Sequence, residues 1–496
     1  MPLTPKAIYD DFINNELDKF FAIELLQTLI ENTESIETRI ESISILDKIP
    51  FNDDINFKFL EHLLISDLNE EVRILTCKVL KNHYFDKALA PISWVLEHEK
   101  SLKCLVTAIS VLSEINTDES KSILVEKLRI LSKKESKYNF KEIFKKKKLE
   151  RYNIQDLAYI LLNYYLISFL KIKYGYIKYE LDVGGYITKL DLSNVDPQGI
   201  SLPLLLDLIL SLKHLRFFDL RFNHLLKFPD ISNESDSILS LDLSYNNLIT
   251  LSESVDKLRS LKTLNLKSNR LRSLPRSVGK LYSLEILNLR NNLLVKIPES
   301  LKSLQMLKVL DLHGNKLKSI DFKFNSFIRE LELGWNNFLK FPTSIKSLTS
   351  LEKLGISGNK LKEIPKWIDS LSCLKELEIY DNRIEELPES LGLVTKLQKL
   401  NLRNNQLNSL PPSFIHLKSL KYLNLSWNNF TSLPEWIGKL SSLEELNLWG
   451  NKLATLPYSI TSLSSLKVLD LNFNKFEQLP PLLKELESKP GLIIKL

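Results

Sequence analysis

One period, of 23 residues, constrains what most of this chain can fold into. Asparagines recur at this spacing within the pattern LxxLxLxxNxL, and only the step from Asn315 to Asn336 is shorter, at 21 residues. A degenerate copy precedes them at residues 187–195, with Val195 in the asparagine position. The repeating asparagines are Asn223, Asn246, Asn269, Asn292, Asn315, Asn336, Asn359, Asn382, Asn405, Asn428, Asn451 and Asn474. Such a fixed period indicates units that each pack against the next.

The pattern within one repeat predicts its backbone. Leucines in LxL alternate, so they lie on one side of a short strand, and parallel stacking of such strands buries that side. The asparagine amide can satisfy backbone groups of the following turn and of the neighbouring repeat, which leucine could not do. In ten of the twelve repeats an apolar residue and a proline follow, as at Leu433-Pro434. Proline ends the strand, and the stretch after it predicts a turn of 3₁₀- or α-helix on the convex side.

The short repeat predicts an irregularity. The segment 315–336 lacks two residues and has Ile320-Asp321 in place of the apolar-proline pair. We expect a local change in the convex backbone there, and with it a change in curvature.

These repeats, LPxxIxxLxxLxxLxLxxNxL, resemble the intracellular Ras-group leucine-rich repeats from Ile187 to about Gln478. The resemblance implies a right-handed solenoid bent into an arc. It also implies that other proteins are the chief ligands and that they bind on the concave face.

The N-terminal third has helical periodicity. Leu46, Leu80 and Leu112 lie 34 and 32 residues apart, each on an apolar helical face, with another apolar helix between successive members. This spacing resembles HEAT-type repeats, and Glu71–Leu80 is the best match. The predicted fold is therefore α+β and multidomain. Its predicted parts are HEAT-like repeats over 1–132, a Lys-rich linker or helix over 133–153, a terminal helix and capping β-hairpin over 154–186, a solenoid with a parallel concave sheet over 187–480, and a C-terminal cap over 481–496.

The bulk composition restricts the environment and the partners. The formal charge of +6 is small for 496 residues and does not by itself indicate nucleic acid. The lysine cluster of Lys133 to Lys148 favours a solvated segment, with a docking patch for an acidic protein, a lipid surface or nucleic acid as the alternative. The N-terminus lacks a secretory signal, and Leu157–Leu170 is too short to span a membrane. We expect a buried helix there, with an interfacial helix as the alternative, in a cytoplasmic protein.

The sequence favours no catalytic, cofactor or metal site. It lacks a phosphate-binding GxxxxGK[ST] loop, and its seven histidines have no metal-ligand spacing. His313 is the only histidine expected on the concave strands. Cys77, Cys104 and Cys373 have no disulfide or zinc spacing and are expected to be buried, inert thiols. We therefore predict a protein that is not an enzyme and has no small-molecule substrate.

The predicted partner-binding site is the concave face. Aromatic residues are frequent at the two positions before the repeat asparagine, and exposed rings are typical interface anchors. The alternative is that each ring packs over its neighbouring repeats. Gly450, beside Trp449, is expected to keep the strand edge open, and mid-strand Asp and Asn to serve solubility. The candidate residues are Phe222, Tyr245, Arg290, His313, Trp335, Tyr380, Arg403, Trp427, Trp449 and Phe473.

Together these patterns predict a non-enzymatic scaffold in signalling or complex assembly. The resemblance to Ras-group scaffolds implies a small GTPase or a signalling enzyme as the ligand. One alternative is a non-catalytic subunit of an enzyme complex. The other is a membrane- or nucleic-acid-associated receptor that uses the lysine cluster. The sequence carries no signal for the oligomeric state.

Overall fold

The computed structural model describes residues 4–134, 149–196, 203–478 and 480–496. The chain divides into two compact units, Met1–Thr188 and Lys189–Leu496.

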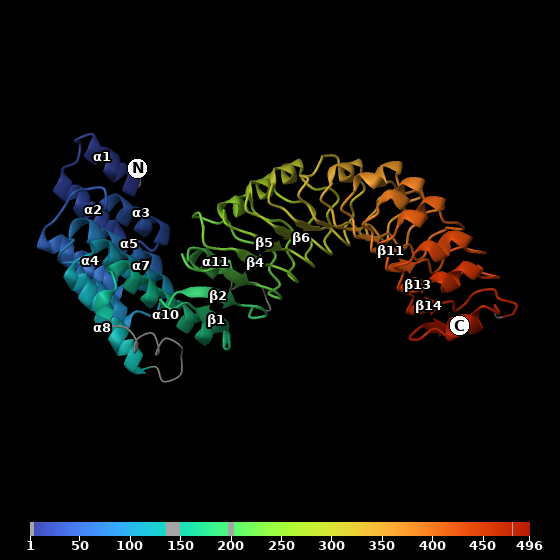
Figure 1. Ribbon diagram of the computed structural model, residues 1–496. Coiled ribbons are helices and arrows are strands. Elements are labelled where there is room, and N and C mark those ends of the chain that lie inside the picture. The colour runs from blue at the N-terminus through green and yellow to red at the C-terminus, as the bar shows by residue number, and fades with distance from the viewer. Residues whose placement is uncertain (1–3, 135–148, 197–202, 479) are drawn as a thin grey trace. The chain divides into compact units, whose positions relative to one another are not determined.

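The first unit is built almost entirely of helices (Figure 1). Most of these helices begin at a Ser, Thr, Asp or Asn whose side chain accepts a hydrogen bond from a backbone N–H of the first turn, as Ser101 does from Cys104 at 3.3 Å. The helices are α1 (Pro5–Ile13), α2 (Lys19–Asn32), α3 (Ile36–Leu46), α4 (Asp54–Ser66), α5 (Glu70–His83), α6 (Leu89–His98), α7 (Leu102–Ile115), α8 (Asp118–Lys134), the 3₁₀-helix η1 (Leu149–Arg151) and α10 (Ile154–Tyr174).

Consecutive helices pack in pairs, α2 with α3, α4 with α5 and α6 with α7, and the second helices of these pairs also pack on one another. Leu46, Leu80 and Leu112 are buried in the shared core, as their periodicity predicts. The helical nature of this region is confirmed, whereas its assignment to HEAT-type repeats stays a prediction.

Helix α10 closes this core. It packs on α7 and α8 and buries Leu157, Leu161 and Leu170, which confirms the interpretation of a buried helix. In the part of the chain that the structure describes, no helix combines the length and the apolar character needed to cross a bilayer. The lysine cluster lies mostly within 135–148, outside the described residues, so its predicted role remains a prediction.

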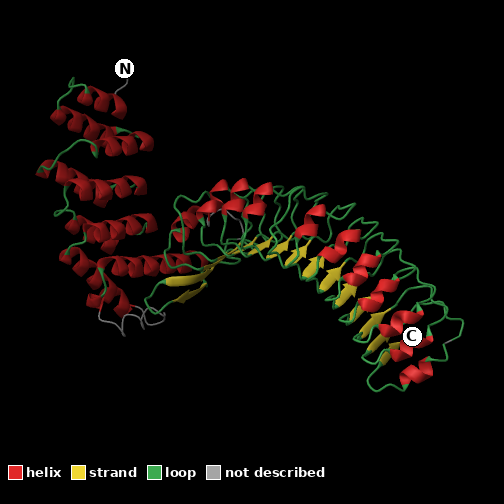
Figure 2. Ribbon diagram, turned by 45° about the horizontal axis from the view of Figure 1, so that its top comes forward, coloured by secondary structure: helices red, strands yellow, loops and turns green. Residues whose placement is uncertain are grey.

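The second unit is a curved stack of repeats, with strands along its inner side and short helices along its outer side (Figures 1 and 2). The sheet has 15 strands in sequence order, of which β1 and the start of β2 fall within Met1–Thr188, and from β2 onward each pairs in parallel with the next. The strands are β1 (Lys178–Leu181), β2 (Ile187–Asp191), β3 (Phe217–Asp219), β4 (Ser240–Asp242), β5 (Thr263–Asn265), β6 (Ile286–Asn288), β7 (Val309–Asp311), β8 (Glu330–Glu332), β9 (Lys353–Gly355), β10 (Glu376–Glu378), β11 (Lys399–Asn401), β12 (Tyr422–Asn424), β13 (Glu445–Asn447), β14 (Val468–Asp470) and β15 (Ile493–Lys495).

Both ends of the sheet carry extra structure. A tight turn joins β1 to β2, and there the carboxylate of Asp182 accepts from the backbone N–H of Gly184 at 2.8 Å. At the other end the expected cap begins with helix α12 (Leu483–Glu487). The apolar tail after it forms β15, which pairs in parallel with β14.

The asparagine ladder is confirmed. Asn382 donates from Nδ2 to the carbonyl oxygens of Ile356 and Ile379, both at 3.1 Å, and its Oδ1 accepts from the backbone N–H of Leu361 at 3.1 Å. Ile356 and Leu361 belong to the preceding repeat, so each asparagine ties its own turn to the repeat before it. The same bonds recur along the sheet, for example at Asn451.

The convex side also follows the prediction. Short 3₁₀-helices begin directly after the proline in most repeats, for instance after Pro434. They are η2 (Glu253–Lys257), η3 (Arg276–Lys280), η4 (Glu299–Ser303), η5 (Thr343–Ser347), η6 (Lys366–Ser370), η7 (Glu389–Leu393), η8 (Pro412–His416), η9 (Glu435–Lys439) and η10 (Tyr458–Ser462). Helix α11 (Pro203–Leu210) lies before β3.

The row of 3₁₀-helices is interrupted between η4 and η5. This interruption falls in the short repeat, whose segment from Asp321 to Ile328 contains no helical turn. Asn325 takes over part of the missing bonding, because its side chain donates to the carbonyl of Leu304 and accepts from the N–H of Phe327 at 2.8 Å. The predicted change in the convex backbone is confirmed.

Candidate protein-interaction face

The residues between the buried leucines form columns on the concave face, because successive strands pair in register. Leu377, for example, lies opposite Leu400, its counterpart one repeat on. Three columns make up the candidate site: those four, two and one residues before each repeat asparagine.

The column four residues before the asparagine has a structural role that the sequence analysis missed. Its Asp and Asn side chains accept a hydrogen bond from the backbone N–H two residues later, as Asn447 does from Trp449 at 3.0 Å. This bond ends the strand and holds the next column in place. The sequence did contain a signal for this role, because an Asp or Asn just before a turn often bonds the backbone of that turn. Solubility alone does not explain why these residues recur at this position. The acceptors are Asp191, Asp219, Asp242, Asn265, Asn288, Asp311, Asn401, Asn424, Asn447 and Asp470.

The column one residue before the asparagine has a left-handed backbone. Residues there have φ between 50° and 69°, a region that Gly, Asn and Asp enter more readily than bulky side chains do. Several repeats place Gly, Asn, Asp or Ser in this column. Five place an aromatic ring there instead: Phe222, Tyr245, Trp335, Trp427 and Phe473.

The expectation for Gly450 was wrong. This glycine has φ +69° and so meets the left-handed requirement of its column, and an added Cβ would lie 3.2 Å from the ring of Trp427. Gly450 therefore gives Trp427 a surface to lie on. Gly358 does the same for Trp335, whose ring would be 2.7 Å from an added Cβ.

The rings nearest the C-terminus form one cluster, which we call the C-terminal aromatic cluster. Trp427 and Trp449 meet edge to face with ring centroids 4.9 Å apart, and Trp449 meets Phe473 in the same way at 5.7 Å. The two tryptophans of adjacent repeats are thus in direct contact. The rings touch their neighbours, yet Trp427 remains 46% exposed and Phe473 78% exposed.

The other candidate residues do not join this cluster. Phe222 and Tyr245 stack 4.6 Å apart beside β3 and β4, and the ammonium of Lys267 lies 5.4 Å from the Tyr245 ring. Trp335, 52% exposed, follows β8, and Tyr380 is half-buried after β10. The face therefore holds separate aromatic sites along one edge of the sheet, where the strands end.

Charged candidates lie in the column two residues before the asparagine. Arg290 approaches His313, with 3.5 Å between Nη2 and Nε2, and lies 3.8 Å from the carboxylate of Asp311. Burial lowers the pKa of His313, and the Arg290 charge lowers it further. Arg403 is exposed beyond β11, next to the C-terminal aromatic cluster along the sheet.

The neighbouring carboxylate of Glu332 occupies space left by a glycine. An added Cβ at Gly355 would lie 1.8 Å from Glu332 Oε2. Burial raises the pKa of Glu332, although Lys353 lies 3.0 Å from Oε1 and acts in the opposite direction. In the described part of the chain, no three His, Cys, Asp or Glu side chains are grouped so as to hold a metal ion.

The cysteines differ from one another. Cys77 and Cys104 are buried as expected, and burial raises the pKa of the Cys77 thiol to about 12. The expectation of burial was wrong for Cys373, which is half-exposed, with its sulfur 3.7 Å from Nζ of Lys396. Its neighbours Leu371 and Leu374 face the core, which turns the cysteine side chain outward.

A curved solenoid of parallel strands, an asparagine ladder and 3₁₀-turns defines the leucine-rich-repeat class of proteins. Family models agree: a leucine rich repeat model matches residues 259–317, and a leucine-rich repeat region model matches 362–455 and 415–489. A leucine-rich-repeat protein of Leptospira interrogans is 32% identical, with a TM-score of 0.52, over 62% of this chain and 90% of that one. The chain belongs to the leucine-rich-repeat family.

A second solved structure shares the fold. An internalin of Listeria monocytogenes is 22% identical, with a TM-score of 0.53, over 62% of this chain and 86% of that one. A search of curated proteins returned no match. Leucine-rich-repeat domains are generally protein-interaction modules. The Ras-group subtype stays a prediction.

Proposed function

We propose that this chain is a non-enzymatic scaffold that binds a partner protein on its concave face, with the C-terminal aromatic cluster as the principal anchor. The proposal rests on one observation: bulky aromatic residues are exposed to solvent although their backbone is left-handed. A left-handed conformation costs a non-glycine residue about 1–2 kcal/mol. Trp427 and Phe473 carry this cost. Other repeats have Gly450 or Asn404 in the same column, and these residue types enter the left-handed region more readily.

Because these rings are exposed to solvent, we infer that they are kept for contact with a partner. Strained residues kept at a surface cluster at binding sites, because their geometry is useful there. Tryptophan is enriched among the residues that dominate interface energies, and a rim of weaker contacts usually surrounds such anchors. A partner that covers Trp427, Trp449 and Phe473 would bury apolar surface that the solenoid leaves in water.

The extent of the face supports a protein as the ligand. Thirteen strands, β2 to β14, at about 4.8 Å spacing span roughly 60 Å. A standard interface needs only about 800 Å² on each side. Through the resemblance to Ras-group repeats, a small GTPase or a signalling enzyme is the first ligand class to test.

The test separates binding from folding. Trp427→Asn with Trp449→Ser places residues that other repeats already hold in these columns, as Asn404 and Ser426 show. Partners captured from native lysate by the full chain are identified by mass spectrometry, and their affinities for parent and variant are then measured. We expect the variant to keep the parent's melting temperature within a few degrees and to bind at least about thirtyfold more weakly.

The matched control is Tyr282→Ala, an exposed aromatic residue that follows η3 on the convex side. It should retain every partner. If the rings only pack against their neighbours, the double variant will melt earlier and keep its affinity, and the proposal fails.

A further inference from the structure

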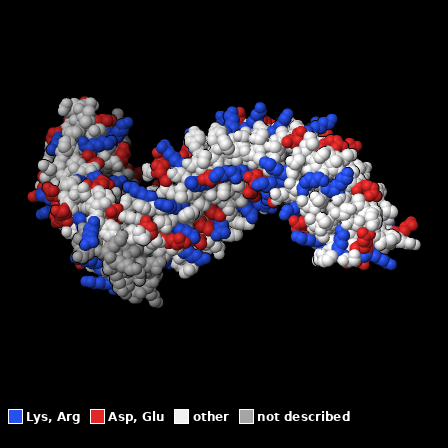
Figure 3. All heavy atoms as spheres, viewed as in Figure 1, with Lys and Arg blue, Asp and Glu red and all other residues white. Residues whose placement is uncertain are grey.

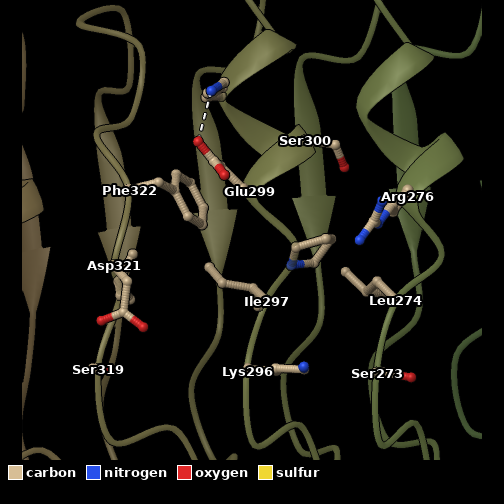
Figure 4. Close-up of a pocket in the computed structure, with 13 residues that line it drawn as sticks. Ser273, Leu274, Arg276, Lys296, Ile297, Glu299, Ser300, Ser319, Asp321 and Phe322 are labelled. Atoms are coloured by element: carbon tan, nitrogen blue, oxygen red, sulfur yellow. Dashed lines mark hydrogen bonds and ion pairs between the residues drawn. The ribbon is translucent and has the colours of Figure 1, made fainter.

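A pocket opens where the row of 3₁₀-helices is interrupted. Its volume is about 610 Å³, and three successive repeats line it (Figure 4). Ile297 lies at its centre, with Leu274 on one side and Phe322 on the other. The rim carries Arg276 and Lys296.

The pocket has a local cause. In most other repeats a 3₁₀-helix follows the apolar-proline pair, but here Asp321 replaces the proline and the segment after it has no helical turn. Helix η3 packs against η4, the helix of the next repeat. Among the described residues, the far side of η4 has no such neighbouring helix. The apolar residues Ile297 and Ile320 are among those that line the resulting gap.

Beside the pocket lies an unusual run of charge, which we call the basic stripe. It occupies the loop positions one, three and four residues after the asparagine in the four repeats from Asn269 to Asn336, and no acidic residue shares those positions. Its members are Arg270, Arg272, Lys296, Lys316, Lys318 and Lys340. All six are exposed, and within the described residues none forms an ion pair. Figure 3 shows Lys and Arg side chains over the middle of the repeat unit, interspersed with Asp and Glu.

Some lysines elsewhere on the same solenoid are paired with carboxylates of neighbouring repeats. Glu285 lies 2.6 Å from Lys308 and 3.3 Å from Lys262, and Glu444 holds two lysines in the same way. In that column, charges of opposite sign alternate from repeat to repeat. The basic stripe has no such alternation, so its mutual repulsion is left for an external anion to relieve.

Apolar residues interrupt the basic stripe. Val295 is 58% exposed and Leu339 66% exposed, and both occupy the same loop positions as the cations. The surface beside the pocket therefore combines unpaired positive charge with aliphatic groups.

We propose that the pocket and the basic stripe form a second docking surface, which binds an acidic peptide segment of a partner protein and takes one aliphatic side chain of that segment into the pocket. Carboxylates of the segment pair with the basic stripe, and the aliphatic side chain covers Ile297 and Ile320. This surface lies on the loops after the strands, in other repeats than the C-terminal aromatic cluster.

The chemistry of the pocket favours a peptide over a nucleic acid. Non-specific binding of single-stranded nucleic acid relies on aromatic platforms for bases, whereas Phe322 is the one aromatic residue among those that line this pocket. Asp321 and Glu299 also lie among the lining residues and would repel phosphates, although Lys302 pairs with Glu299 at 2.7 Å.

The test uses the full chain and a short fluorescent peptide with a central leucine flanked by glutamates. Binding is followed by anisotropy at low and at moderate salt. Matched probes replace the leucine by glycine, or the glutamates by glutamine, and a single-stranded oligonucleotide of similar charge is the fourth probe. We expect the parent peptide to bind in a salt-sensitive way. Each altered peptide should bind about tenfold more weakly or worse.

Variants locate the site. Lys296→Glu with Lys318→Glu should weaken peptide binding by about tenfold, because two exposed, unpaired cations reverse sign without loss of a contact. Lys227→Glu is the matched control: an exposed lysine at the same loop position as Lys296, three repeats earlier. Trp427→Asn with Trp449→Ser should leave peptide binding unchanged. Failure of the proposed peptide site can therefore be distinguished from failure of the proposed concave site.

Any one of four results would overturn the proposal. The peptide fails to bind, the glycine peptide binds as well as the leucine peptide, or the oligonucleotide binds more tightly than the peptide. Equal loss of binding in Lys227→Glu would show a diffuse charge effect and also reject the site.

Discussion

At the scale of single residues, position in the repeat decides backbone conformation more strongly than residue type. Trp427, Asn404 and Gly450 occupy one column with φ of 54°, 50° and 69°. The asparagine that follows each of them bonds backbone groups of two repeats, and those bonds leave one conformation for the residue before it. An intrinsic preference of about 1–2 kcal/mol does not overcome several such bonds.

His313 carries a testable pH dependence. Burial and Arg290 hold its pKa below the ordinary 6.5, so the unfolded chain binds the proton more readily than the folded chain does. The free energy of unfolding should therefore decrease as pH falls through about 6.5, until the lowered pKa of the folded state is passed. Denaturant unfolding of the parent and of His313→Gln at several pH values measures this, and the variant should lose less stability on acidification.

The comparison has a matched control in His416→Gln, an exposed residue in η8. The groups facing His313 are Arg290 and Asp311, and both are unchanged in the variant. Parallel curves for parent and His313→Gln would reject the role of His313.

At the scale of elements, polar bonds join repeats that the leucine core alone would leave free to slide. The three-residue strands pair in register, yet each strand contributes few ladder bonds. The repeat asparagines add bonds to backbone groups 21 to 26 residues away, as Asn382 does to Leu361 and Ile356. Buried backbone groups without such partners would be costly.

Asn382→Leu should destabilise the repeat unit by about 1–3 kcal/mol, because a buried N–H and two carbonyl groups lose their partner. Chemical denaturation followed by circular dichroism measures the change. Asn408→Leu, at an exposed loop position of a neighbouring repeat, is the control and should cost little. An unchanged unfolding midpoint in Asn382→Leu would contradict the ladder.

At the scale of the whole molecule, the chain holds two compact units with different internal order. The first has a core of helices that includes Leu80 and Leu112, and the second stacks leucines such as Leu423 and Leu446 in a row. A stacked repeat unit gains stability from interfaces between neighbours, whereas the helical core is shared among several elements.

We expect denaturant unfolding in two transitions. Leu80→Ala should shift one of them and Leu423→Ala the other, each by about 2–5 kcal/mol, because each removes a fully buried side chain from one core. Far-ultraviolet circular dichroism, with limited proteolysis between the transitions, assigns each transition to a unit. A single transition shifted equally by both variants would contradict independent unfolding.

The 23-residue period by itself determined the strands, the buried leucines, the asparagine ladder and the 3₁₀-turns. Each of these depends on backbone geometry within one repeat, and repetition reinforces the pattern. The concave aromatic column was visible for the same reason, and so was the irregularity near Asp321.

Only the tertiary structure decided which side chains meet across repeats. Gly450 supports Trp427, Cys373 faces outward, and the tail forms β15. The unpaired state of the basic stripe and the pocket beside η4 also became visible only in the folded chain. These features depend on atoms about 20 residues or more apart in sequence, so their packing and charge pairing follow from contacts in space that a local pattern does not contain.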